Sequence, residues 1–339
     1  MSERVDALER TTPMDERTSL PPLSLLELAL VEEGATTAEA LAATVASARR
    51  AEELGFRRVW VAEHHGYRSV GSVAPAVLTA RLAAETMRVR VGSGGVLLTN
   101  HSALAVAEQF TTLAALYQDR IDLGIGRGPG TTDPRVVGAL RRSGESYRDQ
   151  LTELLSYLAG TSALRVVPGL TAVPAPWLLA SSAESAALAG ELGLPLAFAY
   201  HIRPDNAIEA VTRYREAFRP SQWCADPYVL ASVETCCAPS DAEAAELGLP
   251  ARHTMALALQ GQGPDARLLS PAQASEEVLP AALGERLDRM RAAQAHGSPE
   301  TVRRRLRAVA ELTGADELML STPIYDPVLR ARSLELVCS

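Results

Sequence analysis

The chain has 339 residues, of which 47% are hydrophobic and 22% charged, and its net charge is −8. These values are typical of a globular protein and exclude a disordered or fibrous one. The acidic balance argues against nucleic acid as the main partner, because a protein that neutralises phosphates needs a basic face. Since no run of about 18 apolar residues occurs, no membrane span is expected.

The first 20 residues are polar, and we expect them to form a mobile tail outside the core. They contain no apolar stretch of the kind that secretory signals carry, so we expect a cytoplasmic protein. The remaining residues, 21–339, are expected to fold as a single domain. Four cysteines lack metal-ligand spacing and are expected to be reduced thiols: Cys224, Cys236, Cys237 and Cys338.

Eight short apolar runs, rich in Val, Ile and Leu, alternate with longer helical patterns. Continuous apolar runs are typical of parallel strands that are buried on both faces. Eight such strands that alternate with helices predict an α/β fold, a (β/α)8 TIM barrel. A doubly wound open sheet is the alternative, which the lack of a GxGxxG after the first run disfavours. The predicted strands cover residues 23–30, 58–63, 89–98, 121–126, 177–181, 196–200, 228–236 and 317–322.

Helix-end signals predict helices over residues 38–54, 103–118, 183–192 and 298–313. Two other stretches interrupt the alternation. Residues 161–176 are expected to form an irregular excursion before strand 5, and residues 260–280, rich in Gly, Pro and Ser, a long loop after strand 7. Because barrel active sites lie at the C-terminal ends of the strands, this loop is either a lid or a surface linker.

The end of the second predicted strand and the interior of the third carry residues suited to chemistry. His64 and His65 are adjacent, so their side chains point to opposite sides and only one can face the barrel mouth. A histidine there can transfer a proton near neutral pH, although a structural role for both is the alternative. Gly94 and Gly95 allow a flat ligand to approach the third strand, or they mark a tight bend of the barrel wall.

The ends of the fourth and fifth predicted strands are suited to an anion. Arg127, in the sequence GIGRGPG, presents a planar fork that matches phosphate oxygens. Ser181, Ser182 and Ser185 gather at the start of the helix predicted over 183–192, where backbone N–H groups and hydroxyls bind anions. Simple N-capping of that helix by Ser182 is the alternative.

Taken in order, these motifs resemble the bacterial-luciferase-like flavin monooxygenases. The resemblance extends from about Leu23 to the C-terminus and is densest over residues 55–130 and 176–200. It is closest to single-chain bacterial members, some of which tailor antibiotic polyketides. The segments that carry it are AEHH, VGSGGVLLTNHS, AEQFTTLAALYQDRIDLGIGRGPG and LLASSAESAALAGELGLP.

The resemblance implies a role for each of these positions. His64 would be the catalytic acid or base, with His65 beside it, and a cis peptide between Gly94 and Gly95 would lie next to the flavin. Reduced FMN from a separate reductase would react with O2 through a C4a-peroxyflavin and oxygenate a small organic substrate, with a polyketide natural product among the options. A homodimer is also implied. The FMN phosphate would be held by Arg127 and by the turn that contains Ala180, Ser181, Ser182 and Ser185.

Other functions stay open at this point. An F420-dependent oxidoreductase uses the same barrel, but AEHH disfavours it, and the combination of His64 with Arg127 disfavours a noncatalytic flavin-binding subunit. A hydrolase or metalloenzyme barrel is disfavoured because no H-x-H or matching carboxylate set occurs. Gly126 replaces a reactive cysteine of the luciferase large subunit, so light emission is not implied. His201 and Arg203, after strand 6, are further candidates for the rim of the site or for the surface.

Overall fold

The computed structural model describes residues 20–140, 144–164 and 172–339. The tail expected at residues 1–20 therefore lies outside the described residues, except for Leu20. Part of the excursion expected at 161–176 lies outside them as well. Its end differs from the prediction, because the fifth strand begins at Ala175 and not at Trp177.

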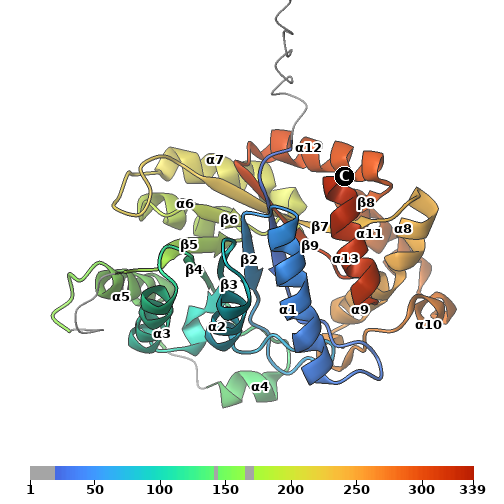
Figure 1. Ribbon diagram of the computed structural model, residues 1–339, viewed down its shortest axis with the longest axis horizontal. Helices are drawn as coiled ribbons and strands as arrows, with labels where there is room; N and C mark the ends of the chain where they lie inside the picture. Colours follow the sequence, from blue (N-terminus) through green and yellow to red (C-terminus); the bar gives the residue numbers. More distant parts are fainter. Residues whose placement is uncertain (1–19, 141–143, 165–171) are drawn as a thin grey trace, which may run out of the picture.

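Eight parallel strands close into a barrel, as the sequence predicts, and the helices surround it (Figure 1). Closure occurs where β9 pairs with both β1 and β7, and where β6 pairs with β7. A ninth strand, β8, was not predicted; it has three residues and pairs only with the end of β7. The strands are β1 (Leu23–Glu27), β2 (Arg58–Val61), β3 (Arg90–Leu97), β4 (Ile121–Gly126), β5 (Ala175–Ala180), β6 (Leu196–Phe198), β7 (Val229–Cys237), β8 (Ala295–Gly297) and β9 (Glu317–Ser321).

The four helices that the sequence predicts are present, with ends within two residues of those expected. Thr36 and Glu39 form a capping box at the first helix, and Gly314 ends the twelfth with a left-handed φ of 57°. The last helix lies beside the first and completes the ring (Figure 1). The ring helices are α1 (Thr37–Glu53), α2 (Pro75–Glu85), α3 (Ala103–Leu116), α4 (Pro134–Ala139), α5 (Tyr147–Leu158), α6 (Ala183–Glu191), α7 (Ala207–Ala217), α12 (Pro299–Thr313) and α13 (Pro327–Cys338).

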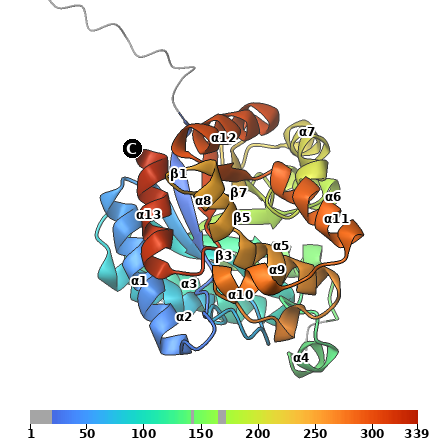
Figure 2. The same cartoon turned by 90° about the vertical axis from the view of Figure 1, so that its right-hand side faces the viewer.

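A helical insertion separates β7 from β8 and lies on one side of the barrel, which faces the viewer in Figure 2. The prediction of a plain loop over residues 260–280 is wrong in part, because Ser270 and Gln273 form a capping box that starts α10. Backbone hydrogen bonds tie this stretch to the loops after β1 and β2. The insertion contains α8 (Asp241–Leu247), α9 (Leu249–Leu259), the 3-10 turn Gly263–Asp265, α10 (Pro271–Glu276) and α11 (Ala281–Ala292).

Two layers of buried side chains hold the barrel together. The larger lies between the strands and the ring helices, and a smaller one, which includes Trp60 and Trp177, fills the interior. Below that interior layer, at the N-terminal ends of the strands, Arg58 is buried against Asp122 and Glu317. The floor of the barrel is therefore closed by charges, and the open end is the C-terminal one. Among the described residues, no helix has the length and hydropathy needed to cross a membrane.

Candidate active site

A cavity of about 480 Å³ opens at the C-terminal ends of the strands. Most of its lining is aliphatic, and a small number of polar groups converge on it, which is the usual composition of a small-molecule site. Leu268, from the insertion, forms part of the cover. The polar and charged lining residues are Glu63, His64, Ser69, Arg127, Ser181, His201, Ser232, Glu234, Thr254 and Ser321.

Glu63 is a buried carboxylate that organises the wall after β2. Its oxygens accept hydrogen bonds from the backbone N–H of Leu97 at 2.9 Å and from the Nε2 atoms of His65 and His101 at 2.8 Å each. Burial is the largest influence on this carboxyl and would raise its pKa, but the hydrogen bonds together lower it. His65 is thus held by Glu63, and it does not line the cavity.

His64 points the other way and lines the cavity, as the alternation of side chains predicts. Its backbone N–H donates to the carbonyl of Ser72 at 2.9 Å, and its Nδ1 is buried without a hydrogen-bond partner among the described residues. Burial, followed by the charges of His201 and His65, lowers the pKa of His64 from 6.5 to about 4. At neutral pH this imidazole is uncharged and can accept a proton.

Gly94 and Gly95 line the same cavity, and the peptide bond between them is cis, as the resemblance implies. A Cβ atom on Gly94 would lie 2.8 Å from Cδ1 of Leu26, and one on Gly95 would lie 2.7 Å from the carbonyl oxygen of Gly124. The close approach of β4 therefore favours glycine at position 95, and the side chains of Leu26 and Trp60 leave little room for a Cβ atom at position 94. Both interpretations, ligand approach and a tight barrel wall, are compatible with this geometry.

Arg127 lies where this cavity meets a second one of about 430 Å³ and lines both. Its guanidinium carbon is 6.0 Å from the ring centroid of Tyr147, and it makes no hydrogen bond or ion pair with any residue that the structure describes. Arg148, which sequence reasoning missed, adds a second guanidinium, with Nη2 2.5 Å from Oε2 of Glu191. The other polar residues of this second cavity are Thr99, Glu145, Ser146, Glu184 and Ser185.

The serine turn after β5 lies next to Arg127, but its members differ. Ala180 and Ser181 line the first cavity and Ser185 lines the second. Ser182 lines neither; its Oγ accepts the backbone N–H of Ser185 at 3.3 Å and caps α6. The capping interpretation therefore describes Ser182, while its neighbours face the space beside Arg127.

Of three residues beyond β5, two line the cavity and one lies on the surface. His201 lines the cavity, whereas Arg203 pairs with Asp205 on the surface at 3.0 Å and does not line it. Glu234 lines the cavity from β7 and was not predicted. Its signal was visible in the sequence, because it is a lone carboxylate in the apolar strand VLASVETCC. No cluster of three or more His, Cys, Asp or Glu suited to a metal occurs within the part of the chain that is described.

A family model described as luciferase-like monooxygenase matches residues 25–317. The chain belongs to this family. A luciferase-like monooxygenase of Escherichia coli K12 is 37% identical over 320 residues, which cover 92% of this chain and 95% of that protein. The crystal structure of apo-MsnO8 superposes with a TM-score of 0.87 at 40% identity and covers 95% of this chain and 98% of that one.

The oxygenating constituent of 3,6-diketocamphane monooxygenase from Pseudomonas putida, solved in complex with FMN, has the same fold. Its TM-score is 0.69 at 19% identity, with coverage of 95% of this chain and 98% of that one. This luciferase-like protein is therefore an enzyme, a flavin-dependent monooxygenase on a TIM barrel. The cavity at the C-terminal face is where a TIM barrel places its active site.

Proposed function

We propose that this enzyme uses reduced FMN and O2 to oxygenate a small, largely apolar organic molecule. The observation that carries the proposal is the position of Arg127 between two adjoining cavities. The first is broad and mostly aliphatic, which suits a flat ring system, and the second carries groups that suit a phosphate. A flavin that lacks a phosphate would leave the second cavity without a ligand group.

Arg127 and the groups around it are hydrogen-bond donors of the types that bind phosphate oxygens. The guanidinium of Arg127 has no acidic partner among the described residues, and Ser185 and the backbone N–H groups at the start of α6 lie nearby. Arg148 also lines this cavity, but it is paired with Glu191, so Arg127 is the guanidinium that we propose for the phosphate. These groups support FMN as the cofactor, held by Arg127, Ser181 and Ser185.

The residues of the first cavity support an oxygenation. Reduced FMN supplies the two electrons that activate O2. Neutral His64 is suited to hold or move a proton at its ring nitrogen, and Glu63 fixes the wall by holding His65 and His101. The insertion contributes Leu268 and Met255 to the lining, and such apolar side chains reduce the access of water to the reacting atoms. His65 therefore acts as a positioning residue in this proposal.

The lining also limits the substrate class. Side chains of Leu30, Val70, Met255, Ala258 and Leu268 surround the outer part of the cavity. This lining favours an apolar molecule, and an aromatic polyketide, an alkane or an aldehyde would each satisfy it.

We also propose a separate flavin reductase, because the chain has no nicotinamide-binding fingerprint. A homodimer is part of the proposal, since Val73, Val77, Met87 and Leu116 expose apolar side chains on or beside α2 and α3. Buried, unpaired Cys236 is compatible with a cytoplasmic location.

The test is an anaerobic titration with reduced FMN, followed by rapid mixing with oxygenated buffer. A slowly decaying near-ultraviolet band that precedes the spectrum of oxidised FMN is the expected result. Tighter binding of F420 with no such band would place the chain among the F420-dependent oxidoreductases. Stable FMN binding without reaction with O2 or any substrate would indicate a noncatalytic subunit.

A further inference from the structure

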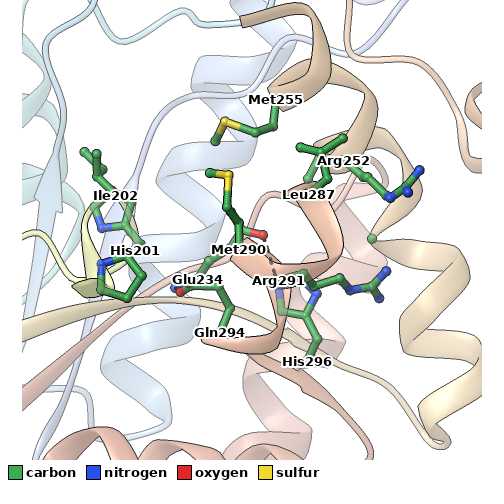
Figure 3. A pocket seen from close by; sticks show the side chains of 13 residues that line it. His201, Ile202, Glu234, Arg252, Met255, Leu287, Met290, Arg291, Gln294 and His296 are labelled. Carbon is green, nitrogen blue, oxygen red and sulfur yellow. Dashed lines mark hydrogen bonds and ion pairs between the residues drawn. The ribbon is translucent and has the colours of Figure 1, made fainter. Parts of the chain in front are cut away.

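A second set of titratable side chains lies beside the active-site cavity, away from His64. His201 follows β6, Glu234 belongs to β7 and His296 belongs to β8. All three line a side cavity of about 50 Å³ that adjoins the first cavity (Figure 3). In the closed barrel β6 is four strands away from β2, so His201 enters from the wall opposite the strand that carries His64.

We infer that His296, Glu234 and His201 form a proton path from an outer groove to the active-site cavity, and that His201 is its inner proton-transfer residue. The inference rests on the proposed function, because it assigns a source to a proton that oxygenation consumes. When substrate, O2 and anionic reduced flavin give oxygenated product, oxidised flavin and water, the balance takes up one proton. That proton comes from solvent, and a mostly aliphatic cavity that limits water around the reacting atoms benefits from a defined path for it.

The hydrogen bonds of His201 fix its tautomer. Its Nδ1 lies 2.7 Å from Oγ of Ser232, and that hydroxyl donates its own hydrogen to the carbonyl of Phe198 at 3.2 Å. Ser232 must therefore accept from Nδ1–H, which leaves the lone pair of the neutral ring on Nε2. Burial lowers the pKa of His201, and the charge of Glu234 raises it in part. The ring can accept a proton at Nε2 and release it to the cavity.

Glu234 lies between the two histidines, as Figure 3 shows. Its Oε1 is 3.1 Å from Nε2 of His296, an ion-pair contact that does not have hydrogen-bond geometry. Burial is the largest influence and would raise the pKa of Glu234, but His296, His201 and Arg291 together lower it. The backbone N–H of Glu234 donates to Oε1 of Gln294 at 3.0 Å, which fixes the position of this residue. The carboxylate is thus partly exposed, lies in contact with His296 and interacts with His201 through charge.

His296 connects this interior to the surface. It lines both the side cavity and an outer groove of about 320 Å³. Its Nδ1 is buried and has no hydrogen-bond partner among the described residues, so no contact that the structure describes occupies that nitrogen. The other charged residues of the groove are Asp241, Asp288, Arg291 and Arg305.

The side cavity has room to complete the path. A volume of about 50 Å³ accommodates a water molecule, whose share of liquid volume is about 30 Å³. Polar groups of His201, Glu234 and Gln294 face this space and give such a water the partners it needs. A proton then moves from the groove to His296, through Glu234 and the water to His201, and each group regains its proton from the one before it.

The remaining charges that face the path have partners of their own. Arg252 pairs with Asp288 at 3.3 Å, and Arg291 donates from Nη2 to the carbonyl of Ala244 at 3.2 Å. His64 interacts with His201 through charge from the opposite wall. Neither arginine can release a proton near neutral pH, so the three named groups are the ones able to transfer it.

The first experiment uses the protein without flavin. Histidine ring signals are followed by NMR as a function of pH in the wild type and in Glu234→Gln. Because the carboxylate raises the pKa of His201, its signal should titrate at lower pH in the variant. The matched control is His253→Gln, which removes a buried histidine that lies 3.8 Å from Glu277 in the insertion and lines neither cavity. An unchanged His201 titration in Glu234→Gln would overturn the path.

The second experiment measures the rate at which product forms from the probe substrate, an aliphatic aldehyde, in the presence of reduced FMN and O2. Glu234→Gln and His296→Gln should slow product formation roughly 100-fold, the order of a single proton-transfer group, with FMN affinity unchanged. Imidazole added to the buffer should restore His296→Gln, because that site opens to the groove, whereas a structural role would not respond. Wild-type rates in both variants, or no rescue, would overturn the path. Failure of the wild type to bind reduced FMN would instead refute the proposed function, and the NMR titration would still test the path.

Discussion

Arg58 and Glu317 form a two-point ion pair across the floor of the barrel, with Nε 2.7 Å from Oε1 and Nη2 3.0 Å from Oε2. Arg58 is 3% exposed and Glu317 is fully buried. The same guanidinium also reaches Oδ2 of Asp122 at 2.8 Å. One arginine therefore joins the first residues of three strands, β2, β4 and β9. These residues lie at the end of the barrel opposite the active site.

Replacing Arg58 with Met should destabilise the fold without changing the active site. The variant leaves Glu317 buried beside only a Tyr228 hydroxyl, the hydroxyl of Ser24 and a distant Arg57, so we expect a loss of about 3 kcal/mol in the free energy of unfolding. Urea denaturation measures it. Arg203→Met, which removes an exposed pair, should change stability by less than about 1 kcal/mol. Equal effects in the two variants would contradict this account of the floor.

Arg127→Ala should weaken binding of the FMN phosphate without affecting binding of the flavin ring. Loss of a charge-assisted contact to phosphate weakens binding by about 1.5–3 kcal/mol, or roughly 10- to 150-fold for FMN. Riboflavin, which has no phosphate, should bind wild type and variant alike. Flavin fluorescence titrations measure both affinities, and Arg135→Ala, an exposed arginine paired with Asp133, is the control. An equal loss for FMN and riboflavin would show that Arg127 does not bind the phosphate.

His64→Ala should leave FMN affinity unchanged and lower product formation, because the ring is proposed to handle a proton and not to hold the cofactor. Product yield per FMN oxidised measures this effect, and general acid–base groups contribute typically about 100-fold or more. FMN affinity, measured by fluorescence in the same variant, is the internal control. Turnover at the wild-type rate would remove His64 from the mechanism.

The depressed pKa of His64 also makes stability depend on pH. This pKa is about 4 in the folded protein against 6.5 for an unperturbed histidine, so the unfolded chain binds more protons between these values. Stability therefore falls as pH falls through this window, by up to about 1.4 kcal/mol per unit from this group. His64→Gln should show a shallower decline in the free energy of unfolding from pH 6.5 to pH 4. Parallel curves for wild type and variant would contradict the burial of a neutral imidazole.

Val77→Glu should dissociate the proposed homodimer. Val77 is 68% exposed on α2, and a carboxylate there would face an apolar partner surface. Light scattering coupled to size exclusion measures the mass. Val278→Glu, at a position that is 94% exposed between α10 and α11, is the control and should leave the mass unchanged. A monomeric wild type would refute the dimer directly.

The barrel could be predicted because its strands are local features. Each of the eight runs is mostly apolar, and each overlaps an observed strand. The three-residue strand β8 was missed, since Ala295–Gly297 is too short to show periodicity and its pairing with β7 depends on the insertion. Helix α10 was missed because the composition of residues 260–280 suggested a loop, although the Ser270 cap and Pro271 were signals of a helix start.

The sequence by itself determined the barrel, the order of its elements and the motif positions, because strand and helix periodicity and end signals are local and the barrel rules order them. It also placed His64 and Arg127 at strand ends, and Gly94 and Gly95 inside the third strand. Only the tertiary structure decided which of two adjacent histidines faces the cavity, that Ser182 is a cap, and that Arg127 joins two cavities. It alone brought Glu234 and His296 together, because contact between residues 62 positions apart depends on how the chain returns to β7, and no local pattern records that path.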